Sequence, residues 1–222
     1  MFNCIVFGGS GSVGQELVHK IAASSKWAHV ILVLRQVIPE HEAYREDPRF
    51  MFFITQNIMD FDTLQAEFIK NLPIHAIFNL IGGEIGQDAE FLQKIEVDWC
   101  IEILHLAQRL KCEIYSRILS RYLKKGRLVK VFHLQAVFLE KIQNEQLPNI
   151  TIMKPGVLLG RKHNPKFGFE CLAAIFCMKR IKCSKVAEIQ LFEAEKALER
   201  NEKKGLVVYE HDDMLRLVNA SD

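Results

Sequence analysis

The chain has 222 residues, 49% of them hydrophobic, and its 29 lysines and arginines nearly balance its 27 aspartates and glutamates. This length predicts a single domain over residues 1–222 with one sizeable core. A formal charge of +2 excludes a strong overall attraction to nucleic acid or anionic lipid, so nucleic-acid binding is not expected. We expect neither a transmembrane segment nor a secretory peptide, because no apolar run approaches roughly 18 residues and the N-terminus lacks a basic region.

The six cysteines contain no C-x-x-C pair, and no cysteine or histidine follows at the short spacing typical of structural zinc. We therefore predict no metal site, and expect small buried hydrophobic residues and a reducing compartment. The cytoplasm fits this expectation, and the mitochondrial matrix stays open. The cysteines are Cys4, Cys100, Cys112, Cys171, Cys177 and Cys183.

Apolar runs alternate with helical patterns in the first half of the chain. Continuous apolar runs are typical of parallel strands that are buried on both faces. Alternation with helices predicts a doubly wound α/β fold with a parallel sheet. We expect strands at 3–7, 29–34, 51–54 and 76–83, and helices at 12–23, 61–70 and 87–110, the last with Phe91, Ile95, Trp99, Ile103 and Leu106 on one face.

The segment after Leu110 allows two interpretations. Either 112–119 is the fifth strand, although Ser116 and Arg117 are unusual in a central strand, or the strand lies at 128–135. We favour the first, with a helix at 128–143. Later we expect a strand from 149 that ends at Pro155-Gly156, a small C-terminal cap or loop region at 161–186, a helix at 184–200, a strand at 205–209 and a helix at 211–218.

The stretch "FGGSGSVG" joins the first expected strand to the first expected helix. Its glycines at Gly8, Gly11 and Gly14 permit a tight turn, close approach of the backbone to a pyrophosphate, and close packing of helix on strand. A phosphate there meets free amide groups at the positive end of the helix dipole. The stretch predicts a dinucleotide site formed by Gly8, Ser10, Gly11, Ser12, Val13 and Gly14.

Three further positions extend this predicted site. Arg35 ends the second expected strand, where an acid favours NAD and a basic residue favours the 2′-phosphate of NADP, so we predict NADP over NAD. Asn57 and Ile58 follow the third strand, where an amide can meet the adenine edge, and Asp60 is a predicted helix N-cap. Gly82 and Gly83 end the fourth strand, where the backbone can approach the cofactor.

With these residues in view, the sequence resembles the atypical short-chain dehydrogenase/reductase superfamily of NAD(P)-binding Rossmann proteins, and in particular its Tat-interacting-protein-like oxidoreductase group. The resemblance covers nearly the whole chain, through "FGGSGSVG", Arg35, "NIMD", "FNLIGG" and "KPGVLLG". The last stretch is the most specific, because its counterpart in the family lies beside the nicotinamide. The resemblance thus implies cofactor contacts at Pro155, Gly156 and Val157.

The chain departs from the family at the catalytic residues. The family uses a serine at the end of strand five and a Y-x-x-x-K pair on the next helix, in which the lysine lowers the pKa of the catalytic tyrosine. No Y-x-x-x-K occurs here, since Pro48, Leu119, Gly126 and Asp213 lie four residues after the four tyrosines. Counting back from Pro155 places the tyrosine position within 131–133 and the lysine position within 135–137. Ser120 can retain the serine position, and His133 is the only titratable substitute for the tyrosine.

Three functions remain in contention. The first is an NAD(P)(H)-binding protein that has lost the family's chemistry and acts as a regulatory or structural subunit with a protein partner or in a larger assembly. The second is an active NADPH-dependent reductase that uses Ser120 and His133. The third is a module that binds an acidic partner, RNA or anionic lipid through a basic segment at 111–130, for which a solvated loop is an equally good explanation. Its basic residues are Lys111, Arg117, Arg121, Lys124, Lys125, Arg127 and Lys130.

Overall fold

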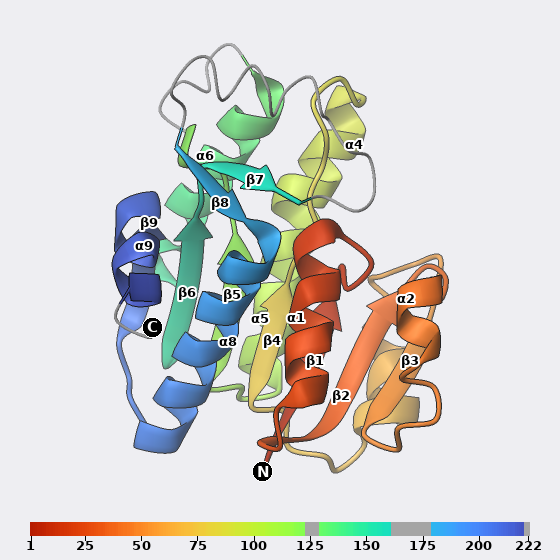
Figure 1. Ribbon diagram of the computed structural model, residues 1–222. Coiled ribbons are helices and arrows are strands. Elements are labelled where there is room, and N and C mark those ends of the chain that lie inside the picture. The colour runs from red at the N-terminus through yellow and green to blue at the C-terminus, as the bar shows by residue number, and fades with distance from the viewer. Residues whose placement is uncertain (123–128, 161–178, 220–222) are drawn as a thin grey trace.

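The computed structural model describes residues 1–122, 129–160 and 179–219. Seven strands form one parallel sheet in the order β3-β2-β1-β4-β5-β6-β9, which confirms the predicted α/β class (Figure 1). β7 and β8 form a separate two-stranded parallel sheet. The strands are β1 (Phe2–Phe7), β2 (Trp27–Leu34), β3 (Phe50–Ile54), β4 (Ala76–Asn79), β5 (Ile114–Ile118), β6 (Asn149–Lys154), β7 (Val157–Leu159), β8 (Arg180–Lys182) and β9 (Gly205–Glu210).

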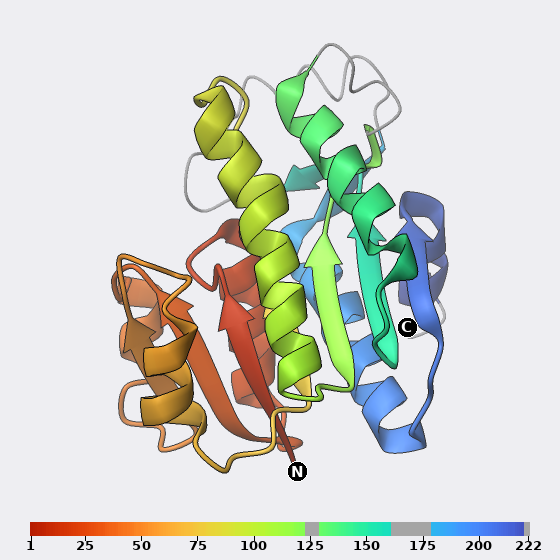
Figure 2. The ribbon, with the colours of Figure 1, turned by 180° about the vertical axis from the view of Figure 1, so that it is seen from behind.

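Helices cover both faces of the large sheet. In Figure 1, α1 (Ser12–Ala23) and α8 (Cys183–Arg200) lie in front of it. Figure 2 shows α5 (Trp99–Arg109) and α6 (Lys130–Lys141) on the opposite face. The shorter elements are α2 (Pro39–Glu42), α3 (Phe61–Leu64) with a π turn (Gln65–Ile69), α4 (Ala89–Gln93) with a π turn (Lys94–Asp98), a 3-10 turn (Ile142–Asn144) and α9 (His211–Asn219).

The apolar strands hold the layers together. The central strands bury side chains on both faces, so one hydrophobic cluster forms under α1 and α8 and a second forms under α5 and α6. Trp27 is fully buried at the start of β2, and its indole N–H donates to Glu195 of α8 at 2.9 Å. Burial of this apolar surface is the main force that stabilises the fold.

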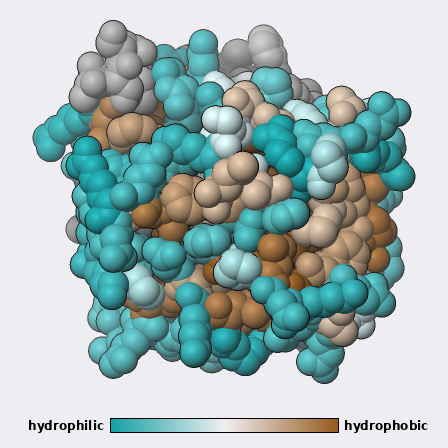
Figure 3. Space-filling view, turned by 90° about the horizontal axis from the view of Figure 1, so that it is seen from below, coloured by the Kyte–Doolittle hydropathy of each residue, from teal (hydrophilic) through white to brown (hydrophobic). Residues whose placement is uncertain are grey.

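The strand order defines where a ligand meets this sheet. The chain moves outward from β1 to β2 and β3, and then from β1 to β4 and β5 in the opposite direction. In such sheets, ligands bind beyond the carboxyl ends of the strands at this point of reversal. Those ends lie at the upper edge in Figure 1. The opposite edge is viewed in Figure 3, where hydrophobic residues lie among hydrophilic ones.

Most expected elements are confirmed. The first helix spans exactly the predicted residues, and β5 and α6 follow the preferred interpretation of the segment after Leu110. The predicted face of the long helix is wrong at its start: Phe91 is 37% exposed, whereas Leu92, Glu96 and Cys100 are buried. The π turn at Lys94–Asp98 carries one extra residue and rotates the helix faces relative to an unbroken α-helical period.

The predictions for the cysteines and for the cap concern residues that are only partly described by the structure. Cys4, Cys100, Cys112 and Cys183 are buried free thiols, as predicted, whereas Cys171 and Cys177 lie outside the described residues. The predicted cap at 161–186 also lies largely outside them, and its last residues belong to β8 and α8. Within the described residues, no helix combines the length and apolar character needed to cross a membrane.

Candidate functional site

The glycine-rich turn connects β1 to α1. Gly8 has a φ of +76°, and a Cβ atom there would lie 2.7 Å from the carbonyl carbon of Leu80. A Cβ atom on Gly14 would lie 2.2 Å from the Gly8 carbonyl oxygen, which is closer than atoms can approach. The turn is closed by a 3.0 Å hydrogen bond that the Gly11 N–H donates to the Gly8 carbonyl. Glycine is therefore required at Gly8 and Gly14 for helix and strand to pack this closely.

The turn leaves the start of α1 open to a ligand. Gly11 is the N-cap and makes no side-chain cap, and no acidic residue occupies the first helical turn. The first amide groups of a helix have no partner within the helix, and the dipole there favours an anion. Gly11 is exposed, and Ser10 and Ser12 are half-buried. The arrangement can thus accept a phosphate on backbone N–H groups.

Arg35 lies at the carboxyl end of β2, next to this turn in the sheet order. Its side chain is exposed, and its backbone carbonyl accepts a 3.2 Å hydrogen bond from the Gln56 side chain. Asn57 is exposed, but its side chain accepts from the Met59 N–H at 3.1 Å and so serves the turn after β3. Ile58 is half-buried against the core. Asp60 caps α3 through the Thr63 N–H at 3.2 Å, as predicted.

The two glycines after β4 have different surroundings. Gly82 is exposed, and a Cβ atom there would make only an ordinary contact with the Glu96 carboxylate at 3.5 Å. Gly83 is packed tightly, because a Cβ atom would lie 2.4 Å from Leu92. The Gly83 N–H donates to Glu96 at 2.6 Å. Gly83 therefore has a packing reason for being glycine that is independent of a cofactor.

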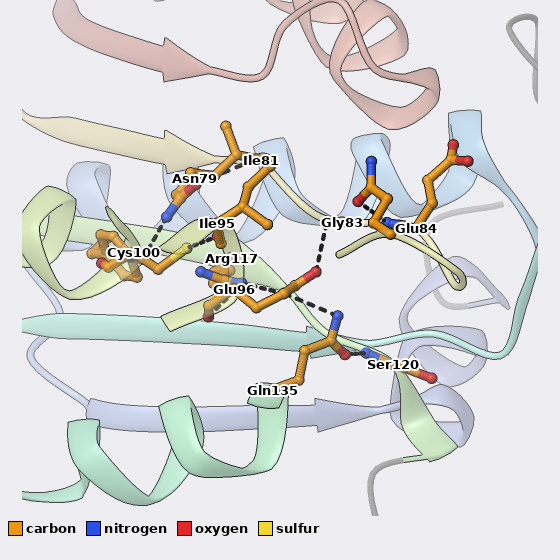
Figure 4. Close-up of polar contacts among 12 residues, drawn as sticks. Asn79, Ile81, Gly83, Glu84, Ile95, Glu96, Cys100, Arg117, Ser120 and Gln135 are labelled. Carbon is orange, nitrogen blue, oxygen red and sulfur yellow. Dashed lines mark hydrogen bonds and ion pairs between the residues drawn. The ribbon is translucent and has the colours of Figure 1, made fainter. Parts of the chain in front are cut away.

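A buried ion pair lies between the long helix and the end of β5. Glu96 and Arg117 are both fully buried, and their charged groups are 2.7 Å apart (Figure 4). Gln135 of α6 donates to the same Glu96 carboxylate at 3.2 Å and accepts from the Ser120 N–H at 2.8 Å. Together with the Gly83 contact, Glu96 connects four segments: the β4 end, the π turn, β5 and α6. We call these four residues, Gly83, Glu96, Arg117 and Gln135, the buried polar network.

In this network the positive charge of Arg117 lies beside the negative charge of Glu96, so that the buried pair has no net charge. Burial lowers the pKa of Arg117 to about 10, and the Glu96 carboxylate opposes that shift. The guanidinium carbon also lies 4.4 Å from the centre of the Phe138 ring, which is a favourable cation–π contact. Arg117 Nε and Nη1 have no hydrogen-bond partner among the described residues. Loss of the carboxylate would therefore leave a poorly compensated buried charge.

The placement of Arg117 corrects one sequence interpretation. The sequence pattern groups Arg117 with the basic segment 111–130 as a residue for an acidic partner, but Arg117 is fully buried and paired. Within β5, the alternation of side chains sends Ser116 to the α8 face, where Gln190 donates to it at 2.8 Å, and Arg117 to the α6 face. Lys124, Lys125 and Arg127 lie outside the described residues.

The two predicted catalytic residues lie on neighbouring elements. Ser120 follows β5, is half-buried, and its hydroxyl accepts from the Tyr122 N–H at 3.1 Å. His133 is exposed on α6. Gln135 bonds the Ser120 backbone, and residues two apart on a helix point in nearly opposite directions, so the His133 side chain faces away from this contact.

None of the four tyrosines stands on α6. Tyr115 is in the core, where burial raises its pKa, and its hydroxyl donates to the Cys100 carbonyl at 3.2 Å. Tyr44 stacks on Phe50 with ring centres 5.0 Å apart. Tyr209 donates to Glu193. Tyr122 is thus the tyrosine beside Ser120.

The turn after β6 is held by its neighbours. A Cβ atom on Gly156 would lie 2.1 Å from the Lys179 carbonyl oxygen, so glycine is required there. The Gly156 N–H donates to Nδ1 of buried His211 at 3.1 Å, and the Val157 N–H donates to Lys179 at 2.9 Å. The Pro155 carbonyl accepts from the Arg121 N–H at 3.2 Å. This turn joins the carboxyl end of β6 to the ends of β5 and β9, at the same edge of the sheet as the glycine-rich turn.

Three residues at this edge were not found from the sequence. Glu96 had a signal, because it follows Leu92 and precedes Cys100 at four-residue spacing and so interrupts an apolar stripe. Gln135 lies within 135–137, the range of the implied lysine position, but an amide there carries no distinctive signal. His41, which is buried beside the glycine-rich turn, had none either. Among the described residues no three potential metal ligands converge.

Several solved structures share this fold. DesIV, a dTDP-glucose 4,6-dehydratase from Streptomyces venezuelae with NAD and TYD bound, matches with a TM-score of 0.72 at 13% identity, over 94% of this chain and 75% of its own. WbmG from Bordetella bronchiseptica in complex with NAD matches with a TM-score of 0.71 at 11% identity, over 99% and 79%. No protein-family model and no curated protein matches the sequence.

A third solved structure, Pen from Bacillus thuringiensis, matches with a TM-score of 0.69 at 12% identity over 87% of this chain. This chain spans only 65% of the length of Pen. The chain therefore has a Rossmann-type fold, which it shares with these solved structures, as its sequence predicted. The resemblance to the Tat-interacting-protein-like group stays a prediction.

The buried polar network generates a stability prediction. Glu96→Gln should lower the free energy of unfolding by about 3–5 kcal/mol, because it leaves the Arg117 charge buried without its carboxylate. Adding Arg117→Met should recover part of this loss, since the double variant no longer buries a charge. Urea unfolding followed by circular dichroism measures both. Additive effects of the two substitutions would contradict the coupling.

Proposed function

We propose that this protein binds a nicotinamide dinucleotide at the turn between β1 and α1, with NADP(H) preferred over NAD(H), and that it acts without the hydride-transfer chemistry of its fold relatives. In this proposal it serves as a regulatory or structural subunit for a protein partner. The similar structures of DesIV and WbmG contain bound NAD, which supports a dinucleotide as the ligand class.

The observation that carries the proposal is the geometry of the glycine-rich turn. Gly8 and Gly14 have no room for a Cβ atom, and Gly11 leaves the amide groups of α1 uncapped. These residues fit a pyrophosphate, which would accept hydrogen bonds from those amides and gain from the helix dipole. When bound, the nicotinamide ring could accept or supply a hydride.

The preference for NADP(H) rests on Arg35. Its exposed side chain follows β2, at the position where an acidic side chain would bind the ribose hydroxyls of NAD. A guanidinium can instead form charge-assisted hydrogen bonds with a 2′-phosphate. Gly82, Pro155, Gly156 and Val157 remain proposed contacts for the rest of the cofactor. Backbone groups of Pro155, Gly156 and Val157 already have partners within the protein, as do Asn57 and Gly83.

The side chains on α6 support the proposed loss of the family's catalytic chemistry. The family resemblance implies a tyrosine within 131–133 and a lysine within 135–137. Here Val131 is 4% exposed, and Gln135 is held by Glu96 and Ser120. Valine has no proton to transfer, so Val131 cannot replace the catalytic phenol. An amide carries no charge, so Gln135 cannot lower the pKa of a phenol as the ammonium of lysine does. The buried polar network thus stabilises the fold where the chemistry would need titratable groups.

A single substitution at the turn separates ligand binding from folding. Gly11→Asp should keep the protein folded, because aspartate is a favoured N-cap, but should abolish the thermal shift with NADPH, because its carboxylate repels the pyrophosphate. Gly11→Ser is the matched control for charge: it also caps the helix and adds a side chain but no charge, so it should reduce the thermal shift less than Gly11→Asp does. Absence of a thermal shift in the wild-type protein with both NADPH and NADH would contradict the proposal.

The preference between cofactors is tested at Arg35. Arg35→Ala should weaken NADPH binding by about tenfold or more and leave NADH binding nearly unchanged, because only NADPH carries the 2′-phosphate that the guanidinium would bind. Isothermal titration calorimetry gives both dissociation constants. Arg200→Ala, at the exposed end of α8, is the control. Equal weakening for both cofactors would remove Arg35 as the discriminating residue.

Ser120 favours a second candidate function. Its hydroxyl lies at the end of β5, where the family resemblance implies a group that polarises a carbonyl, and Tyr122 adjoins it. An NADPH-dependent reductase would then use Ser120, with His133 as proton donor. His133 faces away from the Gln135–Ser120 contact, which is why we prefer the non-catalytic function.

A turnover assay decides between the two functions. We expect no oxidation of NADPH above background with a panel of aldehydes and ketones, because no titratable pair on α6 faces the Ser120 backbone. Turnover that Ser120→Ala or His133→Ala abolishes would establish the reductase instead. Tyr122→Phe tests the adjoining phenol in the same assay.

A further inference from the structure

His41 lies in α2, directly beside the glycine-rich turn. A Cβ atom on Gly9 would lie 3.6 Å from Cε1 of the imidazole, and 3.5 Å from the side chains of both Leu34 and Val18. The ring is thus packed behind the backbone of the turn, between the end of β2 and α1. His41 as a whole is only 1% exposed.

The imidazole is a buried polar group without a settled partner. Neither ring nitrogen makes a hydrogen bond of normal geometry within residues 1–122, 129–160 and 179–219. A buried polar group without a hydrogen bond costs free energy, so such a group needs an explanation. The Gly9 backbone lies close enough to raise the pKa of His41, as a carbonyl that accepts from a protonated ring does.

The charges around His41 are few. Burial is the largest influence and lowers the pKa of His41, while the Glu40 carboxylate next to it raises that pKa. The neighbours from β2 and α1 around Gly9 are the apolar Leu34 and Val18. Tyr44 lies with its ring centre 6.3 Å away, and its hydroxyl is 3.1 Å from Nδ1 of His19. Without a ligand, the surroundings therefore favour neutral His41.

We propose that His41 is a positioning residue of the dinucleotide turn: it takes up a proton when phosphate groups bind at α1, and donates to the Gly9 carbonyl. This inference rests on the proposed function. A bound pyrophosphate brings negative charge to the turn that Gly9 belongs to, which favours the protonated ring. The resulting hydrogen bond fixes the peptide between Gly9 and Ser10, whose N–H can then face the ligand.

The direction of the pH dependence follows from this uptake of a proton. Burial holds the pKa of His41 below its ordinary value in the free protein, and the proposed proton uptake requires a higher pKa in the complex. The affinity for the dinucleotide should therefore increase as the pH falls through the pKa that His41 has in the complex. It should level off below the pKa that His41 has in the free protein. A difference of one pKa unit corresponds to tenfold in affinity. The pyrophosphate itself keeps its charge in this range.

The test measures NAD⁺ affinity between pH 8 and pH 5 by calorimetry. NAD⁺ has no 2′-phosphate to titrate, so its pH dependence reports on the protein. We expect the wild-type protein to bind NAD⁺ about three- to tenfold more tightly at pH 5 than at pH 8, and His41→Phe to bind with much less pH dependence. His29→Gln, at an exposed position near the start of β2, is the matched control. His41→Gln serves if the phenylalanine variant does not fold.

A second measurement follows the proton directly. The imidazole chemical shifts of His41 in nuclear magnetic resonance spectra should titrate at a lower pH in the free protein than with NAD⁺ bound. An unchanged or lower pKa in the complex, or the same pH dependence of affinity in His41→Phe, overturns the role of His41. Failure of NAD⁺ and NADP⁺ to bind at any pH contradicts the proposed function itself.

Discussion

The candidate site depends on the absence of two Cβ atoms. The carbonyl of Gly8 lies where a side chain on Gly14 would begin, and the Leu80 backbone lies where a side chain on Gly8 would begin. These contacts bring the ends of β1 and β4 and the start of α1 together, so that the amide groups of the helix open at the point where the strand order reverses. Any side chain at these positions would separate the helix from the strand. The proposed phosphate site and the tightly packed core are thus products of the same steric constraint.

At the ends of β4 and β5, the structure depends on a buried pair of charges. Glu96 and Arg117 must leave water together, and their mutual attraction and hydrogen bonds offset a large desolvation cost only while both remain. The pair holds the β4 turn, the long helix, β5 and α6 in one register through Gly83 and Gln135. Stability of this kind is incompatible with a mobile titrating pair at the same place. The network therefore accounts for both the order of these segments and the non-catalytic function that we propose.

The fold was largely predictable because its signals are local. Continuous apolar strands, helical periodicity in α1 and the glycine spacing each reside within a dozen residues, and each predicted the kind of element correctly. The predicted strand at 76–83 was too long, because β4 ends at Asn79. The failures came where distant residues decide. A π turn rotated the start of the long helix, and Arg117 was interpreted as a surface charge because its partner is 21 residues away in sequence.

The sequence by itself determined the order of strands and helices, the glycine-rich turn, the arginine after β2 and the absence of a Y-x-x-x-K pair. Only the tertiary structure decided that Glu96 neutralises Arg117, that Gln135 rather than His133 faces Ser120, and that His41 lies behind Gly9. The physical reason is that backbone conformation is encoded by neighbouring residues. The partner and the protonation state of a polar side chain depend instead on which segments the folded sheet brings together.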